Sequence, residues 1–92
     1  MRDKIQLSII APEGKVFEGD VDRVEVPGLD GELGILPGHT ELISLLKPGG
    51  LLTYHIGASA GEISVDGGFV EVGPDRVVVL ANKAEASDLT AS

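Results

Sequence analysis

The sequence predicts an all-β domain, folded as an antiparallel sandwich or a flattened barrel of short strands. Glycine and proline recur at short intervals along the 92 residues, mostly in clusters. These clusters favour tight turns, because proline presets φ and glycine tolerates positive φ. Between them lie short apolar runs, several of which alternate with polar residues as half-buried strands do. Many short strands separated by turns are typical of sandwiches and barrels.

The expected strands follow one another along the chain between these turns. Apolar and polar residues alternate in residues 4–9, 23–26, 62–65 and 70–72, which predicts strands with one buried face. Residues 77–80, Val-Val-Val-Leu, are apolar on both faces. They predict an inner strand of a sheet that is covered on both sides.

Residues 41–46 fit either a strand or one face of a helix. Three leucines in this segment have helical spacing, but Pro37 and Pro48 leave too little room for a stable helix. We therefore expect a strand here.

The end of the sequence changes in character. The segment "ANKAEASDLTAS" loses the β-branched residues and gains alanine, and Ser87 or Asp88 would suit the N-cap of a helix. We expect residues 1–84 to form the sandwich domain and residues 85–92 to form a short polar, alanine-rich tail. A frayed terminus explains the change equally well.

The composition limits the classes of partner. Seven Lys and Arg against fifteen Asp and Glu give a net charge of −8. Such a surface repels nucleic acid and anionic lipid headgroups, and the sequence has no basic patch with interleaved aromatic residues. A basic protein partner would suit this charge, and simple solubility explains it as well. With no signal-peptide core and no membrane-spanning apolar run, we expect a soluble protein that could still dock on a membrane assembly.

The residues that could carry chemistry form no known catalytic or metal-binding pattern. His39 has Glu32 and Glu41 nearby in the sequence, and His55 follows a further turn, but their spacing fits no metal-binding motif. The chain has no cysteine, no serine in a nucleophile elbow, and no glycine-rich loop of the kind that binds nucleotides. We therefore predict no catalytic residue, no cofactor site and no metal site.

The segment "GELGILPGH", residues 31–39, is unusually rich in glycine and proline. Gly34, inside a strand, indicates a bulge or a close approach by other atoms. Pro37-Gly38 turns the chain and leaves His39 at a corner. A docking surface needs such a fixed rim, whereas chain reversal alone needs fewer of these residues. The spacing alone leaves both interpretations open.

Two longer segments carry a resemblance to a known family. Residues 24–49, "VEVPGLDGELGILPGHTELISLLKPG", and residues 65–85, "VDGGFVEVGPDRVVVLANKAE", resemble the epsilon subunit of the F-type, rotary proton-translocating ATP synthase. The opening segment "LSIIAPEGKVFEGDVDRVEVPG" fits the first strands of that subunit. The resemblance extends from Leu7 to Ala84, and its most specific motifs are G-E-L-G-I-L-P-G-H and G-G-F-V-E-V-x-P.

The resemblance implies a flattened sandwich of about ten strands and a role without catalysis or cofactor. An epsilon-type domain belongs to the central stalk, where it binds the side of the gamma subunit and stands on the ring of c subunits. It rotates with both, and so helps to couple proton-driven rotation to ATP synthesis in the head of alpha and beta subunits. The resemblance thus implies a peripheral place on the cytoplasmic face of the bacterial inner membrane, as part of the complex.

The resemblance also implies roles within residues 31–39. Glu32 matches the acidic residue that faces the polar loops of the c-ring, and those loops are basic in this family. His39 matches a position near the gamma and c-ring contacts, so we expect an interface residue and not a metal ligand or a base. The rest of the expected interface, in which the glycines and the proline would fix the loop's shape, comprises Gly31, Leu33, Gly34, Pro37 and Gly38.

The sequence departs from the usual pattern of this family in several places. Thr40-Glu41 replaces a small residue and a proline, Asn82-Lys83 replaces an Asp-Thr pair, and the segment "LLTYHI" lacks a frequent arginine. These differences change the surface charge but not the strand pattern. The usual subunit continues into two antiparallel helices that restrain ATP hydrolysis and, in some bacteria, bind ATP. The present sequence stops where those helices would begin, so we assign neither property to its residues.

Two other classes of function compete with the stalk subunit. A free-standing β-sandwich that binds a small ligand would need a pocket lined by aromatic residues, and the chain has two phenylalanines and one tyrosine. A small hydrolase that used His39 and Glu32 would need a nucleophile or a metal ion near His39, and the sequence offers none.

Overall fold

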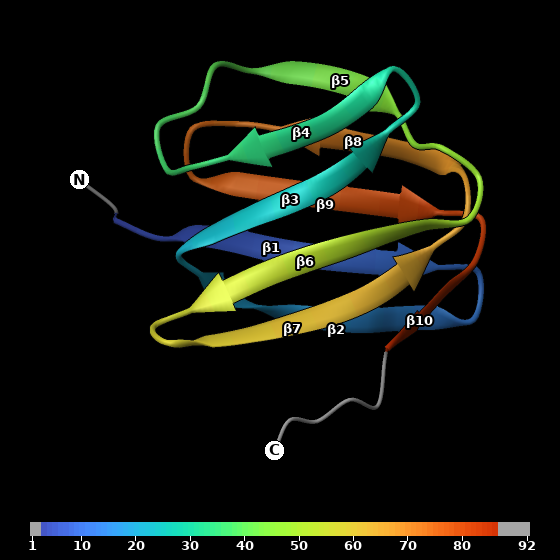
Figure 1. The fold of residues 1–92 in the computed structure, drawn as a ribbon, viewed down its shortest axis with the longest axis horizontal. Coiled ribbons are helices and arrows are strands. Elements are labelled where there is room, and N and C mark those ends of the chain that lie inside the picture. Colours follow the sequence, from blue (N-terminus) through green and yellow to red (C-terminus); the bar gives the residue numbers. More distant parts are fainter. Residues whose placement is uncertain (1–2, 87–92) are drawn as a thin grey trace.

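The computed structural model describes residues 3–86, which form ten strands in two layers (Figure 1). These residues contain no helix, so the expected all-β fold is confirmed. Principal extents of 33 × 32 × 24 Å agree with a flattened shape. The expected helix N-cap at Ser87 or Asp88 lies outside the described residues. The strands are β1 (Ile5–Ala11), β2 (Gly14–Val21), β3 (Arg23–Gly28), β4 (Gly31–Ile35), β5 (Leu42–Leu45), β6 (Gly50–Ile56), β7 (Ser59–Val65), β8 (Gly68–Val72), β9 (Arg76–Ala81) and β10 (Ala84–Ala86).

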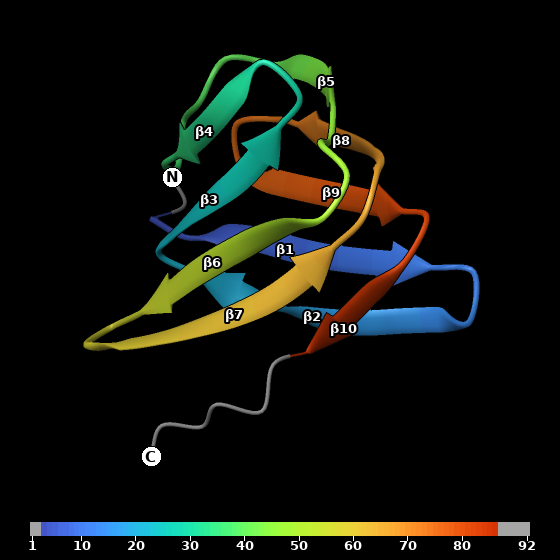
Figure 2. The same ribbon diagram turned by 45° about the vertical axis from the view of Figure 1, so that its right-hand side comes forward.

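The strands divide into two five-stranded sheets. Sheet A has the order β2-β1-β9-β8-β5, and sheet B has the order β10-β7-β6-β3-β4. Figure 2 shows the two sheets as separate layers whose strands cross at an angle. All paired strands are antiparallel except β1 and β9, which are parallel. Parallel neighbours need a long crossover. Here the connection from β1 to β9 contains strands β2 to β8, which belong to both sheets.

The predicted alternation along the strands builds an aliphatic core between the sheets. Ile5, Leu7 and Ile9 of β1 are fully buried, and the polar residues between them face outward. The described residues include no buried polar or charged side chain. The core consists of Ile5, Leu7, Ile9, Val21, Val24, Val26, Ile35, Leu46, Leu52, Ile63, Val65, Val70, Val72, Val77, Val79 and Ala81.

Strand β9 lies at the centre of sheet A, as its apolar sequence predicts. Val77 and Val79 are fully buried between the sheets. Val78 and Leu80 lie on the outer face and are only half-buried, because residues 3–86 supply no third layer there. The prediction that this strand is covered on both sides is therefore wrong for its outer face. An apolar pattern does not specify what covers a face.

The two sheets meet at their β4–β5 edge. The expected strand within residues 41–46 is confirmed as β5. Gly28 and Leu46 form an isolated bridge, and the Leu29 amide donates a hydrogen bond to the Leu45 carbonyl at 2.8 Å. These contacts fix the end of β3 against β5.

Candidate docking surfaces

The hairpin between β3 and β4 holds acidic residues on a short, fixed turn. Leu29 and Asp30 alone connect the paired ends of the two strands. Gly31 follows with a φ of 140°, a conformation that favours glycine. The hydrogen bond from Leu29 to Leu45 ties this turn to β5. Asp30 and Glu32 are exposed, and we call residues 29–32 the acidic turn.

A shallow hollow of about 660 Å³ lies beside the acidic turn. Its lining includes Asp30, Glu32 and the single cation Lys47, together with Pro27 and Gly50. Two carboxylates and one ammonium group leave an excess of negative charge. This surface is electrostatically suited to basic side chains of a partner.

Residues 36–41 form the loop from β4 to β5, which we call the His39 loop. Gly38 has a φ of 88°, and its amide donates a hydrogen bond to the Pro74 carbonyl at 2.6 Å. This bond fixes the loop against the turn between β8 and β9. Nδ1 of His39 lies 2.7 Å from the Thr40 carbonyl oxygen, so Nδ1 carries the proton and donates it. Among residues 3–86, no group of three or more His, Cys, Asp or Glu is placed to hold a metal ion.

Glu32 and His39 lie near opposite ends of β4. A strand rises by about 3.3 Å per residue, so the five residues of β4 hold the two ends about 13 Å apart. A hydrolase that used both side chains would need them within hydrogen-bond reach of one substrate. The structure therefore divides the segment predicted as one interface into two places, the acidic turn and the His39 loop.

The middle of this segment differs from the expectation at Gly34. Strand β4 pairs with β3 in regular register, so the expected bulge is wrong. A Cβ atom at Gly34 would meet no described atom within 4 Å, so within residues 3–86 nothing approaches it closely either. The Leu33 side chain is half-buried and packs against the core. Leu33 thus supports the strand, whereas Gly34 leaves open backbone on the outer face of sheet B.

The outer face of sheet A carries an apolar stripe that is not among the surfaces predicted from the sequence. Leu45, Phe69, Leu80 and Ile10 are paired in register across β5, β8, β9 and β1, and we call these four residues the apolar stripe. Leu45 is 59% exposed, and neighbouring Ile43 is 70% exposed. Apolar side chains that remain exposed on neighbouring strands make this stripe a candidate interaction surface. Part of this signal was present in the sequence, because residues 77–80, and residues 42–46 apart from Ser44, are apolar on both faces of a strand.

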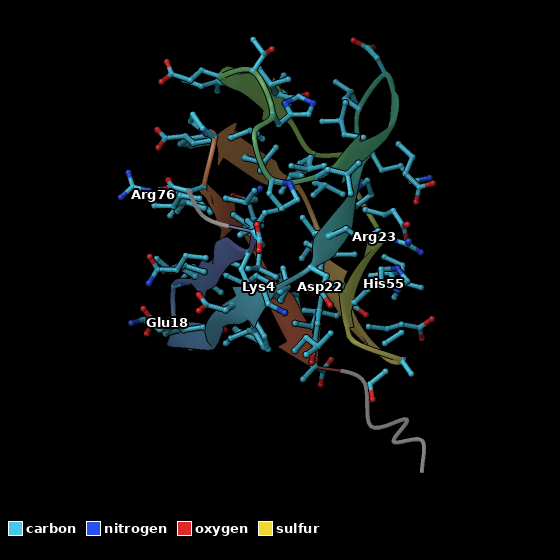
Figure 3. All side chains as sticks on the ribbon, turned by 90° about the vertical axis from the view of Figure 1, so that its left-hand side faces the viewer. Lys4, Glu18, Asp22, Arg23, His55 and Arg76 are labelled. Carbon is cyan, nitrogen blue, oxygen red and sulfur yellow. The ribbon has the colours of Figure 1, made fainter. Side chains whose placement is uncertain are left out.

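The outer face of sheet B is mostly polar, although Leu51 on β6 is exposed there. Glu25 on β3 lies between two basic groups, with Arg23 Nε 3.6 Å from one carboxylate oxygen and His55 Nε2 3.2 Å from the other. Figure 3 shows Arg23 and His55 on one side of the molecule, and Arg76 and Glu18 on the other. His55 is half-buried on β6. Sheets A and B thus present contrasting surfaces.

The aromatic residues do not line a ligand pocket. Phe17 and Tyr54 pack against each other between the sheets, with ring centroids 4.4 Å apart. Phe69, the third aromatic residue, belongs to the apolar stripe. The alternative of a ligand-binding module with an aromatic pocket is therefore not favoured.

Comparison with known proteins identifies the family. The sequence profile of the ATP synthase delta/epsilon chain β-sandwich domain matches residues 4–87. The chain belongs to this family. The delta/epsilon β-sandwich assignment agrees with the two-layered fold and with the resemblance found in the sequence.

Curated relatives of this delta/epsilon domain are bacterial ATP synthase epsilon chains. The chain is 45% identical to that of Bacillus pumilus over 84 residues, which cover 91% of the chain and 63% of the relative. It is 47% identical to that of Alkalihalophilus pseudofirmus over 81 residues, which cover 88% of the chain and 60% of the relative. It is 46% identical to that of Carboxydothermus hydrogenoformans over 88 residues, which cover 96% of the chain and 65% of the relative. The chain thus spans less than two thirds of the length of these relatives.

Solved structures share the delta/epsilon sandwich fold. One is a chain of the Euglena gracilis mitochondrial ATP synthase, in a structure of its OSCP, F1 and c-ring, with a TM-score of 0.85 and 22% identity over 94% of this chain and 55% of that one. Another is from the central stalk and c-ring of the Tetrahymena thermophila mitochondrial ATP synthase, with a TM-score of 0.72 and 17% identity. The match covers 90% of this chain and 66% of that one. At these identities the likeness shows the fold.

Proposed function

We propose that this chain acts as a non-catalytic rotor domain of a bacterial F-type ATP synthase. In this role it docks on the gamma subunit and on the c-ring, and it helps to couple proton-driven rotation to ATP synthesis in the alpha and beta head. Family membership over residues 4–87 supports the assignment to the epsilon position. The observation that carries the mechanism is a fixed acidic turn on a rigid sandwich, which suits mechanical contact.

The acidic turn is the proposed contact with the c-ring. Its shape is held by the two-residue connection, by Gly31 and by the bond from Leu29 to Leu45. A turn that is already ordered loses little conformational entropy when it binds. The exposed carboxylates of Asp30 and Glu32 would pair with basic side chains of the ring loops. Glu32 is the residue assigned the main role.

The apolar stripe is the proposed contact with the gamma subunit. Burial of exposed apolar side chains is the main driving force of protein association, and charged groups mostly set specificity. The His39 loop leads directly into β5, which carries Leu45 of the stripe. We therefore assign His39 to the border of the gamma surface, where Pro37 and Gly38 hold the loop in place.

The proposed location follows from the proposed assembly. Among residues 3–86, no helix is long and apolar enough to cross a membrane. In the proposed assembly the chain is held at the membrane through the c-ring, as a peripheral component on the cytoplasmic face of the bacterial inner membrane. The net charge of −8 favours contact with basic protein loops over contact with anionic lipid.

Charge reversal at the acidic turn tests the proposed function. We expect Glu32→Lys to weaken binding to a purified complex of gamma subunit and c-ring by at least about tenfold, because it replaces attraction by repulsion. Binding of the unchanged chain should also weaken as salt rises, since exposed charge pairs are screened. Surface plasmon resonance at several salt concentrations measures both effects.

Glu62→Lys provides the matched control for this charge reversal. Glu62 lies on β7, away from the acidic turn, so this variant should bind as the unchanged chain does. Circular dichroism should show the same β-sheet spectrum and melting temperature for both variants. Unchanged binding of a folded Glu32→Lys variant would refute the role of the acidic turn.

A further inference from the structure

A second hollow lies at one end of the outer face of sheet A, next to the apolar stripe. It has a volume of about 590 Å³, and its lining includes Glu41, Ile43, Glu71, Gly73, Arg76 and Val78. Gly73 directly follows β8, and its amide donates a hydrogen bond to the Arg76 carbonyl at 2.8 Å. A side chain at this position would occupy space that the glycine leaves open. We call this site the Gly73 hollow.

The Gly73 hollow combines apolar walls with charged groups. Ile43, Glu71 and Val78 are paired in register on β5, β8 and β9, so the Glu71 carboxylate lies between two aliphatic side chains. Within residues 3–86, the structure records no ion pair for Glu41, Glu71 or Arg76. Two carboxylates and one guanidinium group give the hollow an excess of negative charge.

We propose that the Gly73 hollow receives a lysine or arginine side chain of the gamma subunit. This inference rests on the proposed function, and it specifies the chemistry of that contact. The aliphatic stem of a long basic side chain packs against Ile43 and Val78, and its charged head reaches Glu71 and Glu41. Such a side chain matches both features of the hollow, its apolar walls and its negative charge. The apolar stripe supplies affinity, and the Gly73 hollow sets the register of docking.

A purely apolar side chain or an anion suits the Gly73 hollow less well. An apolar group would remove Glu71 from water without giving it a partner, which is costly. An anion would meet two carboxylates and only one guanidinium group, that of Arg76. Arg76 also lines the hollow, and its repulsion limits where the charged head of the incoming basic side chain is placed.

Two variants test the inference by binding of the chain to the purified gamma subunit of the same organism. Gly73→Leu fills the hollow, and its Cβ would meet only the Arg76 carbonyl oxygen at 3.7 Å, an ordinary contact. Gly73 has no positive φ, so the backbone accepts a side chain. Glu71→Gln removes the charge but keeps the shape. We expect affinity to fall about tenfold for Gly73→Leu and about fivefold for Glu71→Gln, with a weaker salt dependence for the latter.

The partner side chain is identified by a double-mutant cycle. Each lysine and arginine of the gamma subunit is changed to methionine and combined with Glu71→Gln. We expect one gamma variant whose loss of affinity largely disappears in the combination, because the pair is already broken. Glu62→Gln on sheet B is the control and should show no coupling.

Leu45→Asp in the apolar stripe separates this inference from the proposed function. If Leu45→Asp abolishes binding while folded Gly73→Leu and Glu71→Gln bind within twofold of the unchanged chain, gamma docks on sheet A and the inference about the hollow is wrong. If no gamma variant couples to Glu71, the inference is likewise overturned. If Leu45→Asp also binds normally, the proposed gamma surface itself fails.

Discussion

An ion pair between Lys4 and Asp22 joins the two sheets. Lys4 Nζ donates a hydrogen bond to Asp22 Oδ1, and the Gly57 amide donates one to Asp22 Oδ2 at 2.6 Å. The bond from Lys4 holds the pKa of Asp22 below its usual value, and the Gly57 amide adds to this effect. The bond to Asp22 raises the pKa of Lys4 above its usual value. The pair, which Figure 3 shows between the two sheets, links the start of β1 to sheet B.

The shifts predict how Lys4→Met changes stability with pH. A lowered carboxyl pKa stabilises the fold above the ordinary value of 3.8, and this contribution is lost as pH falls through the folded pKa. A raised lysine pKa stabilises the fold below the ordinary value of 10.5. This contribution is lost as pH rises through the lysine pKa of the folded state. We therefore expect Lys4→Met to lower the free energy of unfolding at neutral pH, with a smaller difference at about pH 3 and pH 11.

Urea denaturation at these three pH values measures this difference. Lys83→Met is the control, because Lys83 makes no ion pair within the described residues. A Lys4→Met effect that is equal at all three pH values would show that the lysine stabilises only through packing.

Gly68 illustrates a residue that the backbone itself requires. Its φ is 102°, and a Cβ atom there would overlap the Leu80 carbonyl oxygen on β9. We expect Gly68→Ala to lower the free energy of unfolding by about 2–4 kcal/mol, through backbone strain and displacement of β9. Gly34→Ala, also in a strand but in open space, should change it by less than about 0.5 kcal/mol. Chemical denaturation of both variants checks this, and equal effects would contradict the structure.

At the scale of the elements, the strands follow the alternation of the sequence. We expect Val79→Thr to destabilise the domain by about 1–3 kcal/mol, because it places a hydroxyl group without a partner in the core. Val78→Thr, one residue away on the outer face, should change stability by less than about 0.5 kcal/mol. Both changes keep a β-branched side chain, so strand propensity is matched. Thermal unfolding of the two variants measures both losses of stability. A larger loss for Val78→Thr than for Val79→Thr would mean that β9 faces the other way.

The sequence predicts the strands well because burial in a sheet has a period of two residues. Ile5, Leu7 and Ile9 show this directly, and turn residues mark where the strands end. The parallel pairing of β1 with β9 was not predictable, since no local pattern records which distant strands become neighbours. The exposed outer face of β9 was missed for a related reason. Val78 and Leu80 reveal an apolar face, but a partner or a further layer of the chain would leave the same pattern.

The candidate site was predicted only in part. Glu32 and His39 belong to one segment rich in glycine and proline, but Glu32 lies near the start of β4 and His39 lies in the loop beyond its end. The apolar stripe needed the structure, because its four residues come from four strands that are distant in sequence. Cross-strand register, which brings Leu45 beside Phe69, is a property of the fold and not of any one segment.

At the scale of the whole molecule, two kinds of surface extend from one rigid core. The acidic turn projects from the edge where sheets A and B meet, and the apolar stripe crosses the outer face of sheet A. Separate surfaces on one sandwich allow two partners to be bound at once, as a coupling element between a stalk and a ring requires. The polar outer face of sheet B, around Glu25 and His55, is left to solvent in this arrangement.

Hydrogen–deuterium exchange of the chain, free and bound to a complex of gamma subunit and c-ring, tests this account most directly. We expect slower exchange in the bound state at residues 29–32 and 41–46, which carry the acidic turn and the β5 end of the stripe. The hairpin at residues 56–60, between β6 and β7, should exchange at the same rate in both states. Slower exchange confined to that hairpin, with no change at the other two segments, would contradict the account.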